Sequence, residues 1–325
     1  MKLSRNIAAS CIAVALAGVA GLSGAQDKWP TKPVRMVVPF TPSAASDVLS
    51  RIVVARLAEI YGQPFVIDNR PGAGGLIGSD LIRQAAPDGY TLGMVGQPHL
   101  SNALLRTEKP YDPLKDFAAI SLVATTHNVI TIGKGVEVKN IPDLIALARA
   151  KPGALNYGSA GVGSSSHLAG ALFLSKAKIN AVHVPFRVGA DSRSALMAGT
   201  IHLSRYPPPA LPCRPFSCHF LGLAVASAKR AEALPNLPTS AEAGFPEYRS
   251  ESWFGLIAPR ALPRHLITRL NNDIVAVLKA PATRENIVRQ CADVAFSTPE
   301  QFEKLQRSEY AELGALIKEI GMKAQ

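Results

Sequence analysis

The sequence predicts an α/β fold in which parallel strands alternate with helices on both faces of a sheet. Two apolar, β-branched runs, Val34–Pro39 and Phe65–Asp68, each lead into a loop of small residues and then into an amphipathic stretch of helical period. A third run, Tyr90–Val95, follows the turn at residues 87–89. Short strand–loop–helix units in direct succession favour a parallel sheet, because right-handed crossovers return the chain to the same edge.

The loops of the first two units are the first candidate binding positions. Ser46 or Asp47 is expected to cap a helix that runs to about Tyr61, since both side chains accept free N–H groups of a first turn. The loop Pro71–Gly75 precedes a second helix, Leu76–Ala85. Free N–H groups at a helix start favour an anion, so these loops suit a small acidic molecule. The alternative interpretation is an ordinary βα turn.

A second domain is predicted after the run Ala118–Ile132, which is too long for one strand and is expected to cross between domains. A second crossing is predicted near Trp253–Ala258. After it, the helices Pro263–Lys279 and Pro299–Ile320 are expected to pack back on the first domain, the latter with a start signal at Thr298. The second domain is predicted to contain strands at 155–157 and 181–185 and helices at 141–151, 167–177 and 192–198.

The N-terminus is interpreted as a secretory signal at residues 1–25. Lys2 and Arg5 give a basic start, Ile7–Leu22 is apolar, and Ser23-Gly24-Ala25 supplies the small residues for cleavage after Ala25. A membrane anchor is the alternative, but this run is short for a span of about 20 residues. No later stretch reaches about 18 uninterrupted apolar residues. We therefore expect an exported chain of 26–325.

Charge and cysteine content exclude several classes of protein. The formal charge of +11 falls to +9 once the signal is removed, and the basic residues are scattered, so no nucleic-acid footprint is expected. Cys213, Cys218 and Cys291 remain after cleavage; Cys213 and Cys218 can pair locally, but an odd number argues against a scaffold held by disulfides alone. No Cys/His spacing suggests a metal site.

The glycine- and serine-rich stretch Gly158–His167 is the second candidate loop. It contains Gly-x-Gly between a predicted strand and helix, but it lacks the third glycine of a dinucleotide loop. A carboxylate or phosphate held by N–H groups and serine hydroxyls fits better. Ser159 and Ser164 lack the flanking glycines of a nucleophile elbow. His167 is interpreted as a first-turn helix residue that packs locally, rather than as a general base.

Several segments together resemble the periplasmic receptors of tripartite tricarboxylate transporters, also called the Bug family. The resemblance covers nearly all of the chain after the signal, in order. The matching segments are Trp29–Arg35, Val38–Phe40, Asn69–Gly75, Ala86–Leu92, Tyr111–Pro113, Lys115–Phe117, Leu155–Ser159, Val182–Phe186 and Glu251–Leu256.

The resemblance implies a type II periplasmic-binding-protein fold, with two βα lobes joined by crossing strands. Lobe 1 is expected at 26–126 plus 252–325 and lobe 2 at 127–251. The lobes of such a receptor close on a small carboxylate, which is a di- or tricarboxylate, an amino acid or an aromatic acid, and deliver it to a membrane permease. We expect a monomeric periplasmic protein with no catalytic residue, cofactor or metal.

The resemblance also implies which residues touch the ligand. They belong to the first-lobe loop, the second-lobe loop and one further helix start, with two aromatic walls. Asp47 is ambiguous, because a carboxylate repels an acidic ligand unless it caps the helix or meets an amino group. The predicted contact residues are Phe40, Ser43, Ala44, Ala45, Ser46, Asp47, Ser159, Ser164, Ser165, Ser166, Phe186, Gly189 and Ala190.

Two departures from the family pattern leave alternatives open. Ser43 and Ala44 stand where the family usually has two glycines. Residues 201–220 depart from the family altogether and carry prolines that interrupt a helix, so two compensating frame changes or a divergent pocket wall are expected there. The alternative functions are an exported hydrolase that uses a loop serine with His167, and a receptor fold that has lost its ligand.

Overall fold

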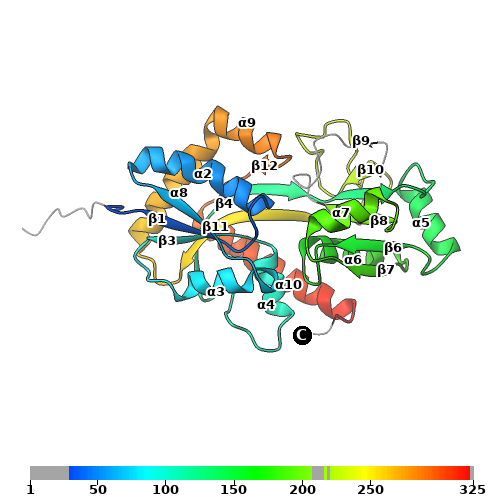
Figure 1. The fold of residues 1–325 in the computed structure, drawn as a ribbon, viewed down its shortest axis with the longest axis horizontal. Helices are drawn as coiled ribbons and strands as arrows, with labels where there is room; N and C mark the ends of the chain where they lie inside the picture. Colours follow the sequence, from blue (N-terminus) through cyan, green and yellow to red (C-terminus); the bar gives the residue numbers. More distant parts are fainter. Residues whose placement is uncertain (1–28, 207–215, 218–219, 323–325) are drawn as a thin grey trace, which may run out of the picture.

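The computed structural model describes residues 29–206, 216–217 and 220–322. The predicted signal peptide, Cys213 and Cys218 lie outside these residues, as does most of the anomalous stretch 201–220. Cys291 is disulfide-bonded. Figure 1 shows two sheets at opposite ends of an elongated molecule, joined by long strands. No helix in the described ranges is long and apolar enough to cross a membrane.

The first sheet has the strand order β12-β4-β11-β3-β1-β2. Strand β1 pairs in parallel with both β2 and β3, as the sequence predicts. The strands that connect the lobes, β4 and β11, run antiparallel to their neighbours, so the expectation of a wholly parallel sheet is wrong. A strand that enters from the other sheet must run against the βα units. The bounds are β1 Val34–Val38, β2 Phe65–Asn69, β3 Thr91–Gly96, β4 Phe117–His127, β11 Glu251–Pro259 and β12 Asp293–Val294.

Helices cover both faces of the first sheet, each with its own apolar core. The helices α2, α8 and α9 pack on one face, and α3, α4 and α10 pack on the other (Figure 1). The return of the C-terminal helices to this sheet is thus confirmed, and Thr298 forms the capping box of α10. The bounds are α2 Ala45–Tyr61, η1 Ala73–Gly75, α3 Leu76–Gln84, α4 Pro98–Leu104, α8 Arg264–Lys279, α9 Pro281–Arg289 and α10 Pro299–Glu319.

The second sheet has the order β7-β6-β8-β5-β10-β9 and repeats the mixed pattern. Strand β6 pairs in parallel with β7 and β8, whereas β5 is antiparallel to β8 and β10. Its cores are separate from those of the first sheet. The bounds are β5 Val129–Gly133, β6 Asn156–Ser159, β7 Val182–Pro185, β8 Leu203–Tyr206, β9 Phe216–Ser217, β10 Phe220–Val225, α5 Ile141–Ala150, α6 Ser165–Ala177 and α7 Gly189–Met197.

The chain crosses between the sheets where the sequence predicts. The run Ala118–Ile132 is divided at Asn128 into β4 of the first sheet and β5 of the second. The return crossing reaches β11 directly after Ser250. The two crossings lie side by side, since Asn128 Nδ2 donates to Ser250 Oγ at 2.9 Å and the Asn128 N–H donates to the Ser250 carbonyl at 3.2 Å.

Candidate functional site

The first predicted loop joins the end of β1 to the start of α2. Helix α2 begins at Ala45, and its N-cap is Ala44, which makes no side-chain capping bond. The prediction that Ser46 or Asp47 caps this helix is therefore wrong. Both residues already lie inside the first turn and are buried, and Asp47 reaches back to the loop instead of to the helix N–H groups.

Asp47 is the centre of a hydrogen-bond cluster that fixes the loop. Its Oδ2 accepts the Ser43 N–H at 2.9 Å and Arg51 Nε at 3.0 Å, and its Oδ1 accepts Arg51 Nη2 and Asn69 Nδ2, both at 3.0 Å. Burial raises the pKa of Asp47, but the bonds from Arg51, Ser43 and Asn69 outweigh burial and lower it. Asp47 is thus an ionised structural group whose charge Arg51 balances.

The cluster decides which backbone groups of the loop remain available. The Ser43 N–H is bound to Asp47, and the Ala44 N–H donates to the Thr41 carbonyl at 3.2 Å. Neither of these two N–H groups, both predicted to contact a ligand, is therefore free in this structure. The N–H groups of Ala45 and Ser46 have no acceptor among the residues placed by the structure. These two N–H groups are therefore the donors that the start of α2 leaves available.

Phe40 stands beside this loop, as predicted for an apolar wall. Its carbonyl accepts Asn69 Nδ2 at 3.0 Å, and the same amide also binds Asp47. A Cβ atom on Gly75 would lie 3.4 Å from Phe40 Cζ, so the ring packs over the backbone of η1. Asn69 thus ties the aromatic residue and the helix start into one unit.

The second loop is shorter than the sequence predicts. Gly158 and Ser159 belong to β6, and α6 begins at Ser165. Ser164 is the N-cap: its Oγ accepts the His167 N–H at 3.3 Å and donates to the Gly161 carbonyl at 2.7 Å. The N–H groups of Ser165 and the following Ser166 have no acceptor within the described chain, so they match the free donors of α2.

The loop hydroxyls of Ser159 and Ser166 brace the second loop from within. Ser166 Oγ accepts the Ala160 N–H at 3.0 Å and lies 3.1 Å from Ser164 Oγ. Ser159 Oγ lies 2.7 Å from His183 Nε2. These hydroxyls therefore hold the shape of the loop, and the backbone N–H groups at the start of α6 are its available donors.

His167 packs locally, as the sequence predicts. Its Nδ1 accepts the Gly163 N–H at 3.1 Å, and its ring stacks on His183 with the centroids 3.9 Å apart. Burial, with a contribution from His183, lowers the pKa of His167 to about 4. Because Ser164 Oγ caps the backbone of α6 and the imidazole of His167 binds the Gly163 N–H instead of this hydroxyl, the geometry does not support a Ser164–His167 nucleophile pair.

Helix α4, which the sequence pattern does not predict, joins the second loop to η1 of the first lobe. Ser101 Oγ donates to the Gly163 carbonyl at 2.9 Å, and Asn102 Nδ2 donates to the Gly74 carbonyl at 2.7 Å. A Cβ on Gly163 would come within 2.8 Å of Asn102 Oδ1, which requires glycine at this contact. Gly74 in turn belongs to η1, against which Phe40 packs, so α4 connects the second loop to the first only through η1.

The third predicted helix start also lies beside the second loop. The Phe186 N–H donates to the Ser159 carbonyl at 3.0 Å, and its ring packs against Gly158. Helix α7 begins at Gly189 without a side-chain cap, and Ala190 follows in its exposed first turn. Phe186 therefore lies between β7 and α7 in the chain and beside the end of β6, and its role as a pocket wall stays a prediction.

A large cavity of about 1040 Å³ lies elsewhere, between α6 and the end of α10. His167, His183 and Tyr157 line it together with Glu319 and Met322. None of the predicted contact residues lines this cavity. In the described part of the chain, no group of three or more His, Cys, Asp or Glu side chains is arranged to hold a metal ion.

Two mixed sheets, each covered by helices and joined to the other by crossing strands, define the class of two-lobed solute-binding receptors. The family model "Tripartite tricarboxylate transporter family receptor" matches residues 49–322. A Pseudomonas sp. (strain P51) protein, "UPF0065 protein in tcbD-tcbE intergenic region", is 34% identical over 96% of this chain and 94% of its own. "Protein BugT" of Bordetella pertussis is 30% identical over 99% of each. The chain belongs to the tripartite tricarboxylate transporter receptors, of the Bug type, which are binding proteins and not enzymes.

Solved structures agree with this assignment. The structure "R. palustris Rpa4515 with adipate" is 35% identical, has a TM-score of 0.82 and covers 90% of this chain and 98% of its own. "MatC (Rpa3494) from Rhodopseudomonas palustris with bound malate" is 26% identical, with a TM-score of 0.78, and covers 89% of this chain and 100% of its own. Both are similar to this chain over both lobes.

Proposed function

We propose that this chain is a periplasmic receptor that captures a small carboxylate between its two lobes. The carrying observation is that α4 contacts the second loop at Gly163 and η1 at Gly74, and that Phe40 of the first loop packs over η1. A carboxylate shared between Ala45–Ser46 and Ser165–Ser166 would satisfy four donors that the described chain leaves open. Gly189 and Ala190 of α7 supply a third helix start beside them.

A dicarboxylate is the ligand class with the most support. The structure of Rpa4515, which is similar to this chain, was solved with adipate, and that of MatC with bound malate. The charge of Asp47 does not oppose such a ligand, because Arg51 balances it. Ligand binding would then favour the closed arrangement of the lobes by bridging both of them.

The lobes are proposed as residues 26–126 with 252–325, and 127–251. Export with cleavage after Ala25, a monomeric state and delivery to a membrane permease of the tripartite type complete the proposal. The family assignment and the paired crossings at Asn128 and Ser250 support these boundaries.

A thermal-shift screen of the mature chain tests the proposal. Adipate, malate and citrate are compared with 1,6-hexanediol, which has the length of adipate but no charge. We expect at least one carboxylate to raise the melting temperature by mass action, whereas hexanediol has no effect. A flat response to every carboxylate would indicate a receptor fold that no longer binds, and ester hydrolysis lost on Ser164→Ala would indicate the hydrolase.

A further inference from the structure

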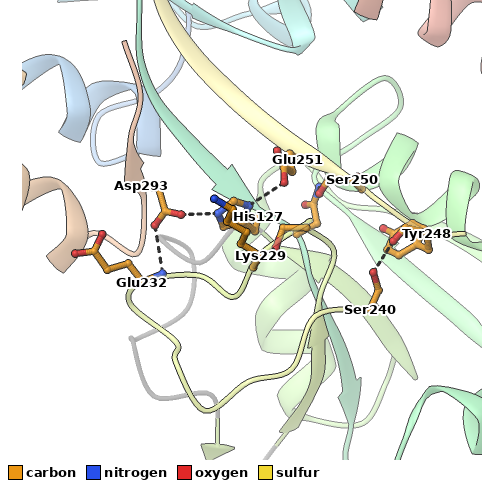
Figure 2. A network of polar contacts seen from close by, with 10 residues as sticks. His127, Lys229, Glu232, Ser240, Tyr248, Ser250, Glu251 and Asp293 are labelled. Carbon is orange, nitrogen blue, oxygen red and sulfur yellow. Dashed lines mark hydrogen bonds and ion pairs between the residues drawn. The ribbon is translucent and has the colours of Figure 1, made fainter. Parts of the chain in front are cut away.

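A buried imidazole lies between two carboxylates where the chain crosses between the lobes (Figure 2). His127 Nε2 is 2.8 Å from Asp293 Oδ2, and its Nδ1 is 3.6 Å from Glu251 Oε1. His127 ends β4, Glu251 begins β11 opposite it, and Asp293 begins β12. The His127 side chain therefore links β4 to β11, the two strands at the crossings, and to the neighbouring β12.

The surroundings keep this imidazole positively charged. Burial alone lowers the pKa of His127, but the hydrogen bond to Asp293 and the ion pair with Glu251 outweigh burial and raise the pKa to about 9. The ion pair with His127 in turn lowers the pKa of Glu251. At neutral pH the His127 imidazolium thus lies between the carboxylates of Asp293 and Glu251. The His127 side chain is only 8% exposed.

Asp293 also reaches the loop that follows β10 of the second sheet. Its Oδ1 accepts the Glu232 N–H at 3.4 Å, and the Glu232 carboxylate pairs with Arg284 of α9 at 2.6 Å. The charged groups that meet the imidazole are Asp293 and Glu251, and Asp293 in turn meets the Glu232 loop, whose carboxylate pairs with Arg284. These groups come from β11, β12, α9 and the loop at 226–250.

That loop packs on the second lobe, because Ala231, Leu234 and Leu237 share an apolar cluster with Leu196 and Ile201. The Ala226 N–H donates to the Asn128 carbonyl, and the Ser250 N–H donates to the Ala226 carbonyl, both at 2.8 Å. The contacts of Glu232 with Asp293 and Arg284 consequently join the second lobe to the first. The hydrogen bond between Ser101 and Gly163 is a second, separate contact between the lobes. A change in the angle between the lobes must strain or break one of these contacts.

We propose that His127, Asp293 and Glu251 form a hinge clamp that favours the arrangement of lobes seen here over more open ones. The imidazolium fixes Asp293 beside β4, and Asp293 then holds the Glu232 loop of the second lobe. The effect of the clamp on ligand affinity rests on the proposed function, because a ligand that binds the closed state binds more weakly when that state is less populated. The effect of the clamp on the arrangement of the lobes does not rest on the proposed function.

Two measurements on the mature, ligand-free chain test the clamp directly. Histidine NMR of the wild type should give one imidazole with a titration midpoint near 9, absent in His127→Gln. Hydrogen exchange at pH 7 should show faster exchange at Glu232 in His127→Gln and in Asp293→Asn, and no change in His265→Gln, an exposed histidine on α8. A midpoint near 6.5, or unchanged Glu232 exchange in a folded His127→Gln, would overturn the proposal.

Calorimetry with adipate then tests the link to ligand capture. We expect His127→Gln to bind about three- to tenfold more weakly than the wild type and His265→Gln to bind equally well. Equal affinity for His127→Gln would overturn the link. If the wild type does not bind adipate, the choice of ligand fails, but the NMR and exchange results still decide the clamp.

Discussion

Asp47 binds the backbone N–H of Ser43 at 2.9 Å, across the turn that leads into α2. This bond holds Ser43 at a φ of 66°, a left-handed conformation that side chains other than glycine rarely adopt. The free N–H groups of Ala45 and Ser46 follow directly. Asp47 therefore fixes the shape of the predicted binding loop, and its contact with a ligand stays a prediction.

Removing this carboxylate should loosen the loop. Asp47→Ala leaves the Ser43 N–H and Asn69 without their acceptor, so the free energy of unfolding should fall by about 2 kcal/mol in urea titrations. Glu59→Ala on the same helix removes an exposed pair with Arg56 and should cost under about 0.5 kcal/mol.

The effect of Asp47 should depend on pH in one direction. The pKa of Asp47 is lower in the folded chain than its ordinary value of 3.8, so its stabilisation is present above 3.8 and is lost as the pH falls through the folded pKa. The stability difference between wild type and Asp47→Asn should shrink below pH 4. A constant difference down to pH 2 would contradict an ionised role.

Ser43 and Ala44 occupy positions where the family usually has glycine. The two residues have different backbone conformations in the structure, so their replacement by glycine should change the stability in opposite directions. Ser43→Gly should stabilise the chain by about 0.5–1 kcal/mol, because glycine adopts the positive φ without strain. Ala44 has a φ of −66°, so Ala44→Gly should destabilise it slightly by adding unfolded-state entropy. Chemical denaturation of both variants checks the opposite signs.

Arg205 is a charged residue in a core position. It is fully buried, and none of its three guanidinium nitrogens has a hydrogen-bond partner in the described structure. Its guanidinium carbon lies 3.7 Å from the Phe173 ring centroid and 4.9 Å from that of Tyr248. Burial lowers the pKa of Arg205 to about 10. Contacts with two rings do not replace the lost hydration of five N–H donors.

Arg205→Met should therefore stabilise the chain by about 2 kcal/mol, measured by urea unfolding. Arg307→Met, at an exposed position on α10, serves as the control and should stay within about 0.5 kcal/mol. The alternation along β8 places Leu203 and Arg205 on the same core face, where apolar residues are expected. A loss of stability in Arg205→Met would show that this arginine has a partner.

Glu309 is predicted to titrate near pH 6. Burial raises the pKa of Glu309 to about 6 despite hydrogen bonds from Trp253 and Gln97. Folding thus disfavours its ionised form, and this penalty grows as the pH rises from the ordinary carboxyl value through 6. Glu309→Gln should raise the melting temperature more at pH 7.5 than at pH 4.5, and Trp253 fluorescence should change near pH 6 only in the wild type.

Sequence patterns predicted the elements whose residues repeat regularly and missed those defined by tertiary contact. The long run Ala118–Ile132 predicted a crossing because no single strand needs that length, and β4 and β5 confirm it. The short helix α4 has little periodicity of its own, and its role depends on Ser101 and Asn102 meeting loops distant in sequence.

The candidate site was only partly predictable for a related reason. The loops and the glycine-to-serine change at Ser43 are visible in the sequence, but which N–H groups stay free depends on Asp47, Asn69 and Thr41. The clamp at His127 could not be predicted from the sequence either, since the partners of His127 lie 124 and 166 residues away along the chain. The predicted contact residues as a set stay a prediction until a ligand is seen.

Proline substitution tests the central claim, a carboxylate shared by two helix starts. Ala45 and Ser165 are the first residues of α2 and α6, where proline removes only the N–H and suits the helix. Calorimetry with the carboxylate that gives the largest thermal shift should show that Ala45→Pro and Ser165→Pro each bind about tenfold more weakly, with unfolding unchanged. Wild-type affinity in either folded variant would contradict the shared site.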